Sequence, residues 1–217
     1  MKWLTIIACF FWLACTGNNN SENKETLSST TAEKQLDPSK LDTAYFAGGC
    51  FWCIEAAFEQ IKGVQEAISG YAGGQQKDPS YQQVSSGMTD HAETVMVLYN
   101  PDVINYNTLL AIFFTAHDPT QLNRQGADVG KQYRSAIFYT KPEEKHSAMK
   151  TIGQLKDSDR FDKAIVTLVE PLKTFYPAEP YHQDYEEKNP DNSYIQNVSL
   201  PKIKKVRKEF PELLKEH

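Results

Sequence analysis

Two cysteines in the stretch GGCFWC, Cys50 and Cys53, are separated by two aromatic residues. Thiols at this spacing can bind a metal, close a disulfide, or carry out redox chemistry. A disulfide that encloses only two residues removes little chain entropy, so a purely structural bridge gains little stability. A structural zinc site needs four ligands, and no second CxxC pair follows. Redox chemistry is therefore the use that the pair favours.

Histidines are the remaining candidates for metal ligands, and the folded part of the sequence offers His91, His117 and His182. None of the three is at the paired spacing that metal sites use. The sequence also has no feature that suggests a nucleotide or an obligate partner. We expect no metal and no cofactor, and we expect a monomer.

The two cysteines lie where a strand is expected to give way to a helix. Residues 43–47 predict a short strand, and the apolar residues after Gly49 keep the spacing of a helix that ends near Gly63. Free N–H groups and the helix dipole at such a junction favour a thiolate at Cys50. Cys53 follows one turn later on the same face, close enough to act as a resolving thiol. Phe51 and Trp52 are compatible with either core or pocket.

Two classes of function fit this arrangement. A thioredoxin-like disulfide oxidoreductase needs little besides the CxxC pair and a cis-proline. A reductase whose cysteine attacks an oxidised substrate atom also needs a proton donor and a shaped pocket. The remainder of the chain has to distinguish the two.

The order of the predicted elements indicates the fold class. The sequence predicts strand, helix, strand, strand, helix, strand, which is the split βαβ order of a ferredoxin-like α+β sandwich. A three-layer α/β sheet is the alternative. Prolines beyond Glu170 predict an extended C-terminal wrap, with an extension from about residue 190. The expected strands are 43–47, 64–71, 94–99, 133–140 and 164–169. One helix is expected directly after Gly49, and three more at 106–117, 142–156 and 202–210.

The N-terminal residues differ in composition from the rest. Residues 1–15 contain one lysine and then an apolar stretch, which is too short to span a membrane but typical of an export signal. Cys15 directly after Leu13 and Ala14 resembles the acylated cysteine of bacterial lipoproteins. Residues 16–41 are polar and predict a disordered tether. We therefore expect a catalytic domain over 42–217, exported to the cell envelope or periplasm and touching the membrane only through a lipid anchor.

The charge of the chain excludes one class of partner. The net charge is −5, the isoelectric point is about 5.6, and the basic residues are scattered. Nucleic acid is therefore not expected as a partner. The basic run 202–208 is expected to be the solvated face of a helix.

Four further stretches make the prediction specific. They are GYAGG at 70–74, YQQVSSGMTDHAETVMVLYNP at 81–101, HDPTQLNRQGADVGKQYRSAIFY at 117–139 and YPAEPYHQDY at 176–185. Together with GGCFWCIE, and in this order, they closely resemble the A-type peptide methionine sulfoxide reductases. The resemblance implies an α+β enzyme that reduces the S epimer of methionine sulfoxide, free or in proteins, and so repairs oxidised proteins.

The resemblance also implies roles for individual residues. By motif position Cys50 is the nucleophile and Glu93 is the proton donor. Phe51 and Trp52 form the pocket for the substrate methyl group. The polar side of the site is completed by Tyr81, Asp128 and Tyr133.

The chemistry agrees with that assignment. A sulfoxide oxygen leaves only when it is protonated, so the acid must be neutral near pH 7, and burial could keep Glu93 neutral. Attack leaves Cys50 as a sulfenic acid. No cysteine follows Cys53. The hypothesis is therefore a Cys50–Cys53 disulfide that a thioredoxin-like donor reduces, and the alternative is direct reduction of the sulfenic acid by an external thiol.

Overall fold

The computed structural model describes residues 40–216. The expected export segment, Cys15 and nearly all of the expected tether therefore lie outside the described residues. Among the residues that are described, no helix has the length and apolar character needed to cross a membrane.

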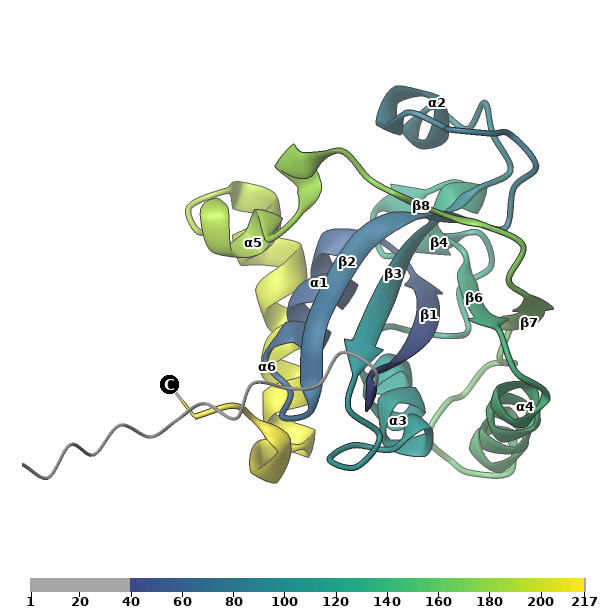
Figure 1. Ribbon diagram of the computed structural model, residues 1–217, viewed down its shortest axis with the longest axis vertical. Coiled ribbons are helices and arrows are strands. Elements are labelled where there is room, and N and C mark those ends of the chain that lie inside the picture. Colours follow the sequence, from purple (N-terminus) through teal and green to yellow (C-terminus); the bar gives the residue numbers. More distant parts are fainter. Residues whose placement is uncertain (1–39, 217) are drawn as a thin grey trace, which may run out of the picture. The chain divides into compact units, whose positions relative to one another are not determined.

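A six-stranded sheet forms the centre of the domain, in the order β7-β6-β1-β3-β2-β8 (Figure 1). Among the four inner strands, each adjacent pair is antiparallel. At the edges, β7 is parallel to β6 and β8 is antiparallel to β2. The strands are β1 Asp42–Gly48, β2 Val64–Ala72, β3 Ala92–Tyr99, β6 Ser135–Tyr139, β7 Leu168–Pro171 and β8 Phe175–Pro177, and a separate hairpin pairs β4 Arg124–Gln125 with β5 Asp128–Val129.

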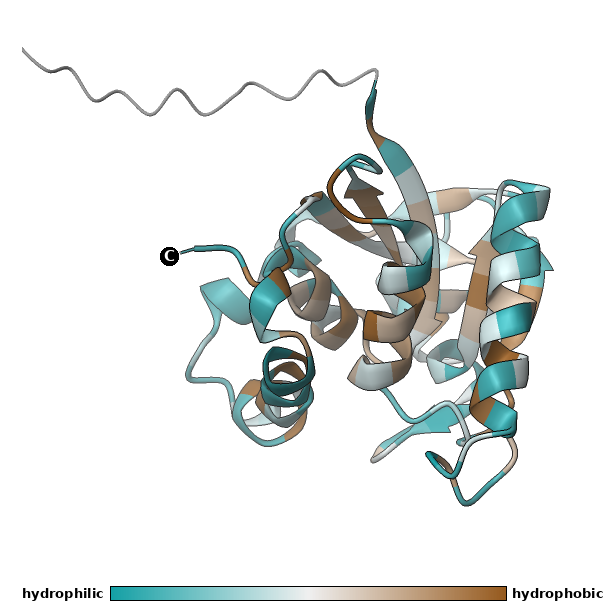
Figure 2. Ribbon diagram, turned by 90° about the horizontal axis from the view of Figure 1, so that it is seen from below, coloured by the Kyte–Doolittle hydropathy of each residue, from teal (hydrophilic) through white to brown (hydrophobic). Residues whose placement is uncertain are grey.

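The helices are of unequal length. α1 and α3 connect the inner strands, and α6 lies beside both of them. The longer helices are α1 Phe51–Glu59, α3 Tyr106–Ala116, α4 Pro142–Lys156 and α6 Leu200–Glu209, and the short ones are α2 Tyr81–Ser85 and α5 Tyr185–Lys188. Figure 2 shows apolar residues concentrated in the strands and in the helices next to them.

The main core lies between the sheet and the helices α1 and α3. Phe46 of β1 stacks on Phe58 of α1 and on Phe113 of α3, with ring centroids 5.3 and 5.0 Å apart. Each fully buried phenyl ring stabilises the fold by about 2 kcal/mol relative to an exposed one. A smaller apolar cluster, which includes Ala47 and Phe138, covers the opposite face. The start of α1 is therefore held against a rigid sheet.

The α+β prediction is confirmed, since β6-β1-β3-β2 is the strand order of the split βαβ arrangement. Several strand boundaries differ from those expected: β3 begins at Ala92 and not at residue 94. The strand expected at 133–140 begins at Ser135, because residues 131–133 form a 3₁₀ turn. The strand expected at 164–169 is β7, Leu168–Pro171.

The segment beyond Glu170 is more regular than an extended wrap. Phe175–Pro177 adds an edge strand to β2, where Gly70 lies opposite Pro177. A side chain at Gly70 would come within 2.4 Å of Phe175, so this close pairing requires glycine. A π-helical turn, Ile195–Ser199, then leads into α6. The chain end thus returns to α1.

Candidate active site

The two cysteines are placed by the turn from β1 into α1. Gly49 has φ +92°, and a Cβ there would lie 2.6 Å from Gln125, so the turn requires glycine. Cys50 is the N-cap of α1, and the Cys53 N–H donates to the Cys50 carbonyl at 3.2 Å. Both cysteines are buried thiols within hydrogen-bond reach of each other. Little movement is needed for them to react together.

Glu93 lies directly beside the start of α1. β3 begins at Ala92, so Glu93 is inside the strand and pairs with Tyr71 of β2. Its side chain is only 2% exposed, and Oε2 accepts the Phe51 N–H at 3.0 Å. Burial raises the pKa of Glu93 to about 8, although the bond from Phe51 opposes this shift. The carboxyl group is therefore mostly neutral at pH 7.

The surroundings of Cys50 oppose the thiolate that is expected there. Burial is the main cause that raises the pKa of Cys50 well above 9.0. The Phe51 N–H, which a thiolate at the helix start would use, is taken by Glu93. The pKa of Cys53 is lowered to about 6, chiefly by the hydrogen bond from Cys50 and, against the effect of burial, by the charge of Lys202. A negative charge on the pair is thus stabilised at Cys53, whose sulfur Lys202 contacts, more than at Cys50.

Aromatic rings surround the two residues between the cysteines. Phe51 is buried among rings that include Tyr81, at 6.4 Å between centroids, and His182, at 5.1 Å. Trp52 is half-buried and stacks on Tyr185 with centroids 3.8 Å apart. Its Nε1–H donates to Nδ1 of His182 at 3.2 Å. Phe51 thus belongs to the core and also faces Tyr81, while Trp52 is fixed by residues about 130 positions later.

The expected polar residues come from three different segments. Tyr81 is the first residue of α2, whose N-cap Ser80 accepts the Gln83 N–H. Tyr133 ends the turn 131–133, and Asp128 lies in β5. Burial raises the pKa of Tyr133, and the charges of Glu93 and Asp128 add to the shift. The structure therefore brings the predicted residues of the folded domain together around Cys50.

The C-terminal segment contributes further residues, of which only His182 was considered from the sequence, as a possible metal ligand. The Tyr194 hydroxyl donates to Oδ2 of Asp128 at 2.6 Å and lies within hydrogen-bond reach of Cys50. Lys202 contacts Cys53. His182 and Tyr185 lie in the stretch YPAEPYHQDY. The aromatic residues of this motif are the feature of the sequence from which their place in the site could have been predicted. Nothing local marks Tyr194 or Lys202, since each is more than 140 residues from the cysteines.

The three histidines considered as metal ligands point to separate partners. His91 contacts the Gln76 carbonyl, and His117 contacts the Phe113 carbonyl and the Ser135 hydroxyl. His182 accepts from Trp52, as described above. Each ring is therefore part of local structure and not of a shared cluster.

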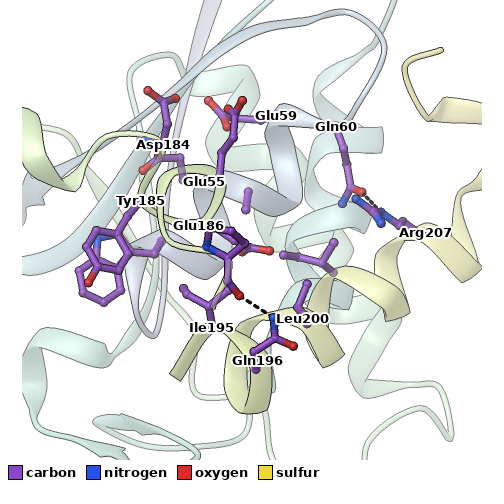
Figure 3. Close-up of a pocket in the computed structure, with 15 residues that line it drawn as sticks. Glu55, Glu59, Gln60, Asp184, Tyr185, Glu186, Ile195, Gln196, Leu200 and Arg207 are labelled. Atoms are coloured by element: carbon purple, nitrogen blue, oxygen red, sulfur yellow. Dashed lines mark hydrogen bonds between the residues drawn. The ribbon is translucent and has the colours of Figure 1, made fainter. Parts of the chain in front are cut away.

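A pocket of about 410 Å³, lined in part by Trp52, lies next to α1, α5 and α6 (Figure 3). Its acidic end holds Glu55, Glu59 and Asp184, with carboxylate oxygens within 4.8 Å of one another. Glu55 accepts hydrogen bonds from the Ser69 hydroxyl and the Asp184 N–H, which tie α1 to β2 and to the start of α5. Neither reacting cysteine lines this pocket. Its acids belong to the packing of α1.

Glu59 gives that packing a predictable pH dependence. Burial is the main cause that raises its pKa from 4.5 to about 8, and the charge of Glu55 adds to the shift. The folded state holds this proton more tightly than the unfolded state. The contribution of Glu59 to the free energy of unfolding is therefore complete below pH 4.5 and is lost as the pH rises through about 8. Tm should therefore fall between pH 5 and 9, and Glu59→Gln should make the fall shallower. Glu66→Gln, at an exposed position of β2, should keep the original slope. Equal slopes for the two variants would contradict the prediction.

Known proteins were compared with the chain as a whole. Residues 42–214 match the family model described as peptide methionine sulfoxide reductase. Peptide methionine sulfoxide reductase MsrA 2 of Synechocystis sp. is 50% identical over 175 residues, which are 80% of this chain and 82% of the relative. Peptide methionine sulfoxide reductase MsrA of Natronomonas pharaonis is 52% identical over 170 residues, 78% of this chain and 96% of the relative.

Solved structures agree with this likeness. The reduced form of Mxr1 from Saccharomyces cerevisiae superposes with a TM-score of 0.68 at 38% identity, covering 73% of this chain and 91% of that one. Methionine sulfoxide reductase A of Corynebacterium diphtheriae gives a TM-score of 0.63 at 34% identity, covering 70% and 77%. With a family model that spans the folded domain and relatives that are half identical, the chain belongs to the peptide methionine sulfoxide reductase family.

Proposed function

We propose that the chain reduces the S epimer of methionine sulfoxide with Cys50 as nucleophile and Glu93 as acid. Reduction of methionine sulfoxide is the activity of its family. The observation that carries the residue assignment is the position of Phe51. Its N–H binds Glu93, its ring faces the ring of Tyr81, and it directly follows Cys50. Nucleophile, acid and apolar wall are therefore fixed to one helix start.

The reduction begins with attack of the Cys50 sulfur on the sulfoxide sulfur. Glu93, neutral because its pKa is about 8, donates its proton to the sulfoxide oxygen. The S–O bond of the substrate then breaks, and the oxygen ends on Cys50 as a sulfenic acid. The substrate sulfur gains two electrons and Cys50 loses two, so methionine is released.

The walls around Cys50 supply a reason for selecting one epimer. Phe51 and Trp52 are apolar and suit the methyl group, whereas Glu93, Tyr81 and Tyr133 are polar and suit the oxygen. Burial raises the pKa of Tyr81 to about 12, so its hydroxyl stays protonated and can donate. With attack from one fixed direction, only one arrangement of methyl and oxygen about sulfur places both groups correctly.

Recovery of Cys50 follows from the position of Cys53. Its thiol lies within hydrogen-bond reach of Cys50, and the sequence has no later cysteine. Cys53 attacks the sulfenic sulfur, an S–S bond forms, and the oxygen leaves as water. A thioredoxin-like dithiol then reduces the Cys50–Cys53 disulfide and is itself oxidised. Direct reduction of the sulfenic acid by an external thiol is the competing route.

Activity on the two separated sulfoxide epimers tests the proposal. The unsubstituted enzyme should release methionine from the S epimer and not from the R epimer. Cys50→Ser should abolish release, because serine at this position is a far weaker nucleophile. Equal use of both epimers would refute the pocket assignment, and retained activity in Cys50→Ser would refute the nucleophile.

A further inference from the structure

One lysine of the basic run on α6 points inward. Lys202 is partly buried, and its Nζ donates to Sγ of Cys53 at 3.6 Å. The other lysines of the run are exposed, as the sequence analysis expected for a solvated face, and they are Lys204, Lys205 and Lys208. The expectation of a solvated face is therefore wrong for Lys202, which contacts the cysteine pair.

The Cys53 sulfur is the group that this ammonium contacts. In residues 40–216 Lys202 makes no ion pair with a carboxylate. It lines a cleft of about 540 Å³ together with the cations Arg160, Lys163 and Lys205 and the acids Asp118 and Asp162. An ammonium group at this distance offsets the cost of burying a thiolate at Cys53.

The other groups that face Cys53 are consistent with one negative charge at its sulfur. Cys50 on α1 and Ser199 at the start of α6 lie close to it and lower its pKa. Ser199 donates to Glu186 of α5 at 2.6 Å. Glu93 of β3 is kept neutral by burial, and burial raises the pKa of Tyr194 so that it stays neutral as well. Lys202 is the cation that contacts the pair directly.

We propose that Lys202 is a positioning residue that keeps the charge of the reduced pair on Cys53, so that Cys53 accepts the Cys50 proton during attack. The inference rests on the proposed function. As the bond from Cys50 to the substrate sulfur forms, the S–H bond of Cys50 breaks and its proton moves to the Cys53 thiolate. Glu93 supplies a second proton to the oxygen. The products are methionine, the Cys50 sulfenic acid, the Cys53 thiol and the Glu93 carboxylate, which carry the same charge and hydrogens as the reactants.

The same contact prepares the second step. Glu93 recovers a proton from Cys53, whose renewed thiolate is again held by Lys202. That thiolate attacks the sulfenic sulfur, the S–O bond breaks, and the Glu93 proton leaves with the oxygen as water. Cys53 and Cys50 are then joined in a disulfide, which is oxidised by two electrons relative to the two thiols.

Thiolate titration of Cys53 tests the role without any sulfoxide. In a Cys50→Ser background, the absorbance of the thiolate near 240 nm is followed against pH for Lys202→Met, Lys202→Arg and Lys204→Met. Removal of a cation in direct contact should raise the Cys53 midpoint by about one pH unit or more. Lys202→Arg keeps the positive charge, so its Cys53 midpoint should stay close to that of the background. Lys204→Met, at an exposed position, should titrate like the background. A Lys202→Met midpoint equal to that of Lys204→Met overturns the proposal.

Single-turnover methionine release from the S epimer provides a second readout with both cysteines present. Lys202→Met should slow release near pH 7, and its rate relative to that of the unsubstituted enzyme should recover as the pH rises, because the thiolate then forms without its cation. A lysine that only supports packing would slow release equally at every pH, and that result counts against the proposal. If the unsubstituted enzyme reduces no sulfoxide, the proposed function fails while the titration still decides the role of Lys202.

Discussion

Glu93→Gln should lower kcat/KM for methionine S-sulfoxide by about 100-fold or more, the usual contribution of a general acid. Glutamine keeps an oxygen that can accept the Phe51 N–H, so the start of α1 should stay in place. It has no acidic proton to give to the sulfoxide oxygen. The loss should therefore appear in the rate of methionine release while Tm changes little.

The pH profile gives this prediction its direction. Since the pKa of Glu93 is about 8, the unsubstituted enzyme should lose activity as the pH rises through that value, and Glu93→Gln should lack this limb. Glu59→Gln is the matched control, because Glu59 also has a pKa of about 8 but lines the separate acidic pocket. It should leave kcat/KM unchanged.

The same variant separates the two function classes that fit the cysteine pair. A sulfoxide reductase loses its activity with Glu93, whereas any exchange with the disulfides of insulin does not need this acid. Loss of insulin exchange with intact sulfoxide reduction would instead favour a thioredoxin-like oxidoreductase.

The features that were predicted correctly are local in sequence. The alternation of apolar residues gave the strands and helices of the split βαβ order, and α4 begins and ends as expected at Pro142 and Lys156. Asn105 caps α3 by accepting the Thr108 N–H, as its residue type predicts. The error at the start of β3 was small, but it matters for Glu93, which is inside the strand and paired with Tyr71.

The features that were missed depend on contacts between distant segments. Tyr194 reaches Asp128 across 66 residues, and Lys202 reaches Cys53 across 149. A helix dipole argument at Cys50 treats only its own element, whereas the location of the thiolate depends on burial, on Glu93 and on a lysine from α6. No pattern within either segment specifies which lysine of the basic run turns inward.

Cys53→Ser should stop catalysis after one turnover when thioredoxin is the electron donor. The unsubstituted enzyme, given the S epimer without reductant, should end as a Cys50–Cys53 disulfide, lighter than the reduced enzyme by about two mass units. Cys53→Ser should end as a Cys50 sulfenic acid, heavier by about 16 mass units. Each should release at most one methionine per enzyme, and Cys53→Ser should do so more slowly at neutral pH because it lacks the thiolate beside Cys50.

The choice of reductant then distinguishes the two routes of recovery. A disulfide is the substrate of a thioredoxin-like dithiol, so steady-state turnover with thioredoxin should fall in Cys53→Ser to the level without a donor. Dithiothreitol is small enough to reach the sulfenic acid and should restore part of the turnover. If Cys53→Ser turns over with thioredoxin as fast as the unsubstituted enzyme, recovery passes directly through the sulfenic acid. The thiolate at Cys53 would then serve the first step alone.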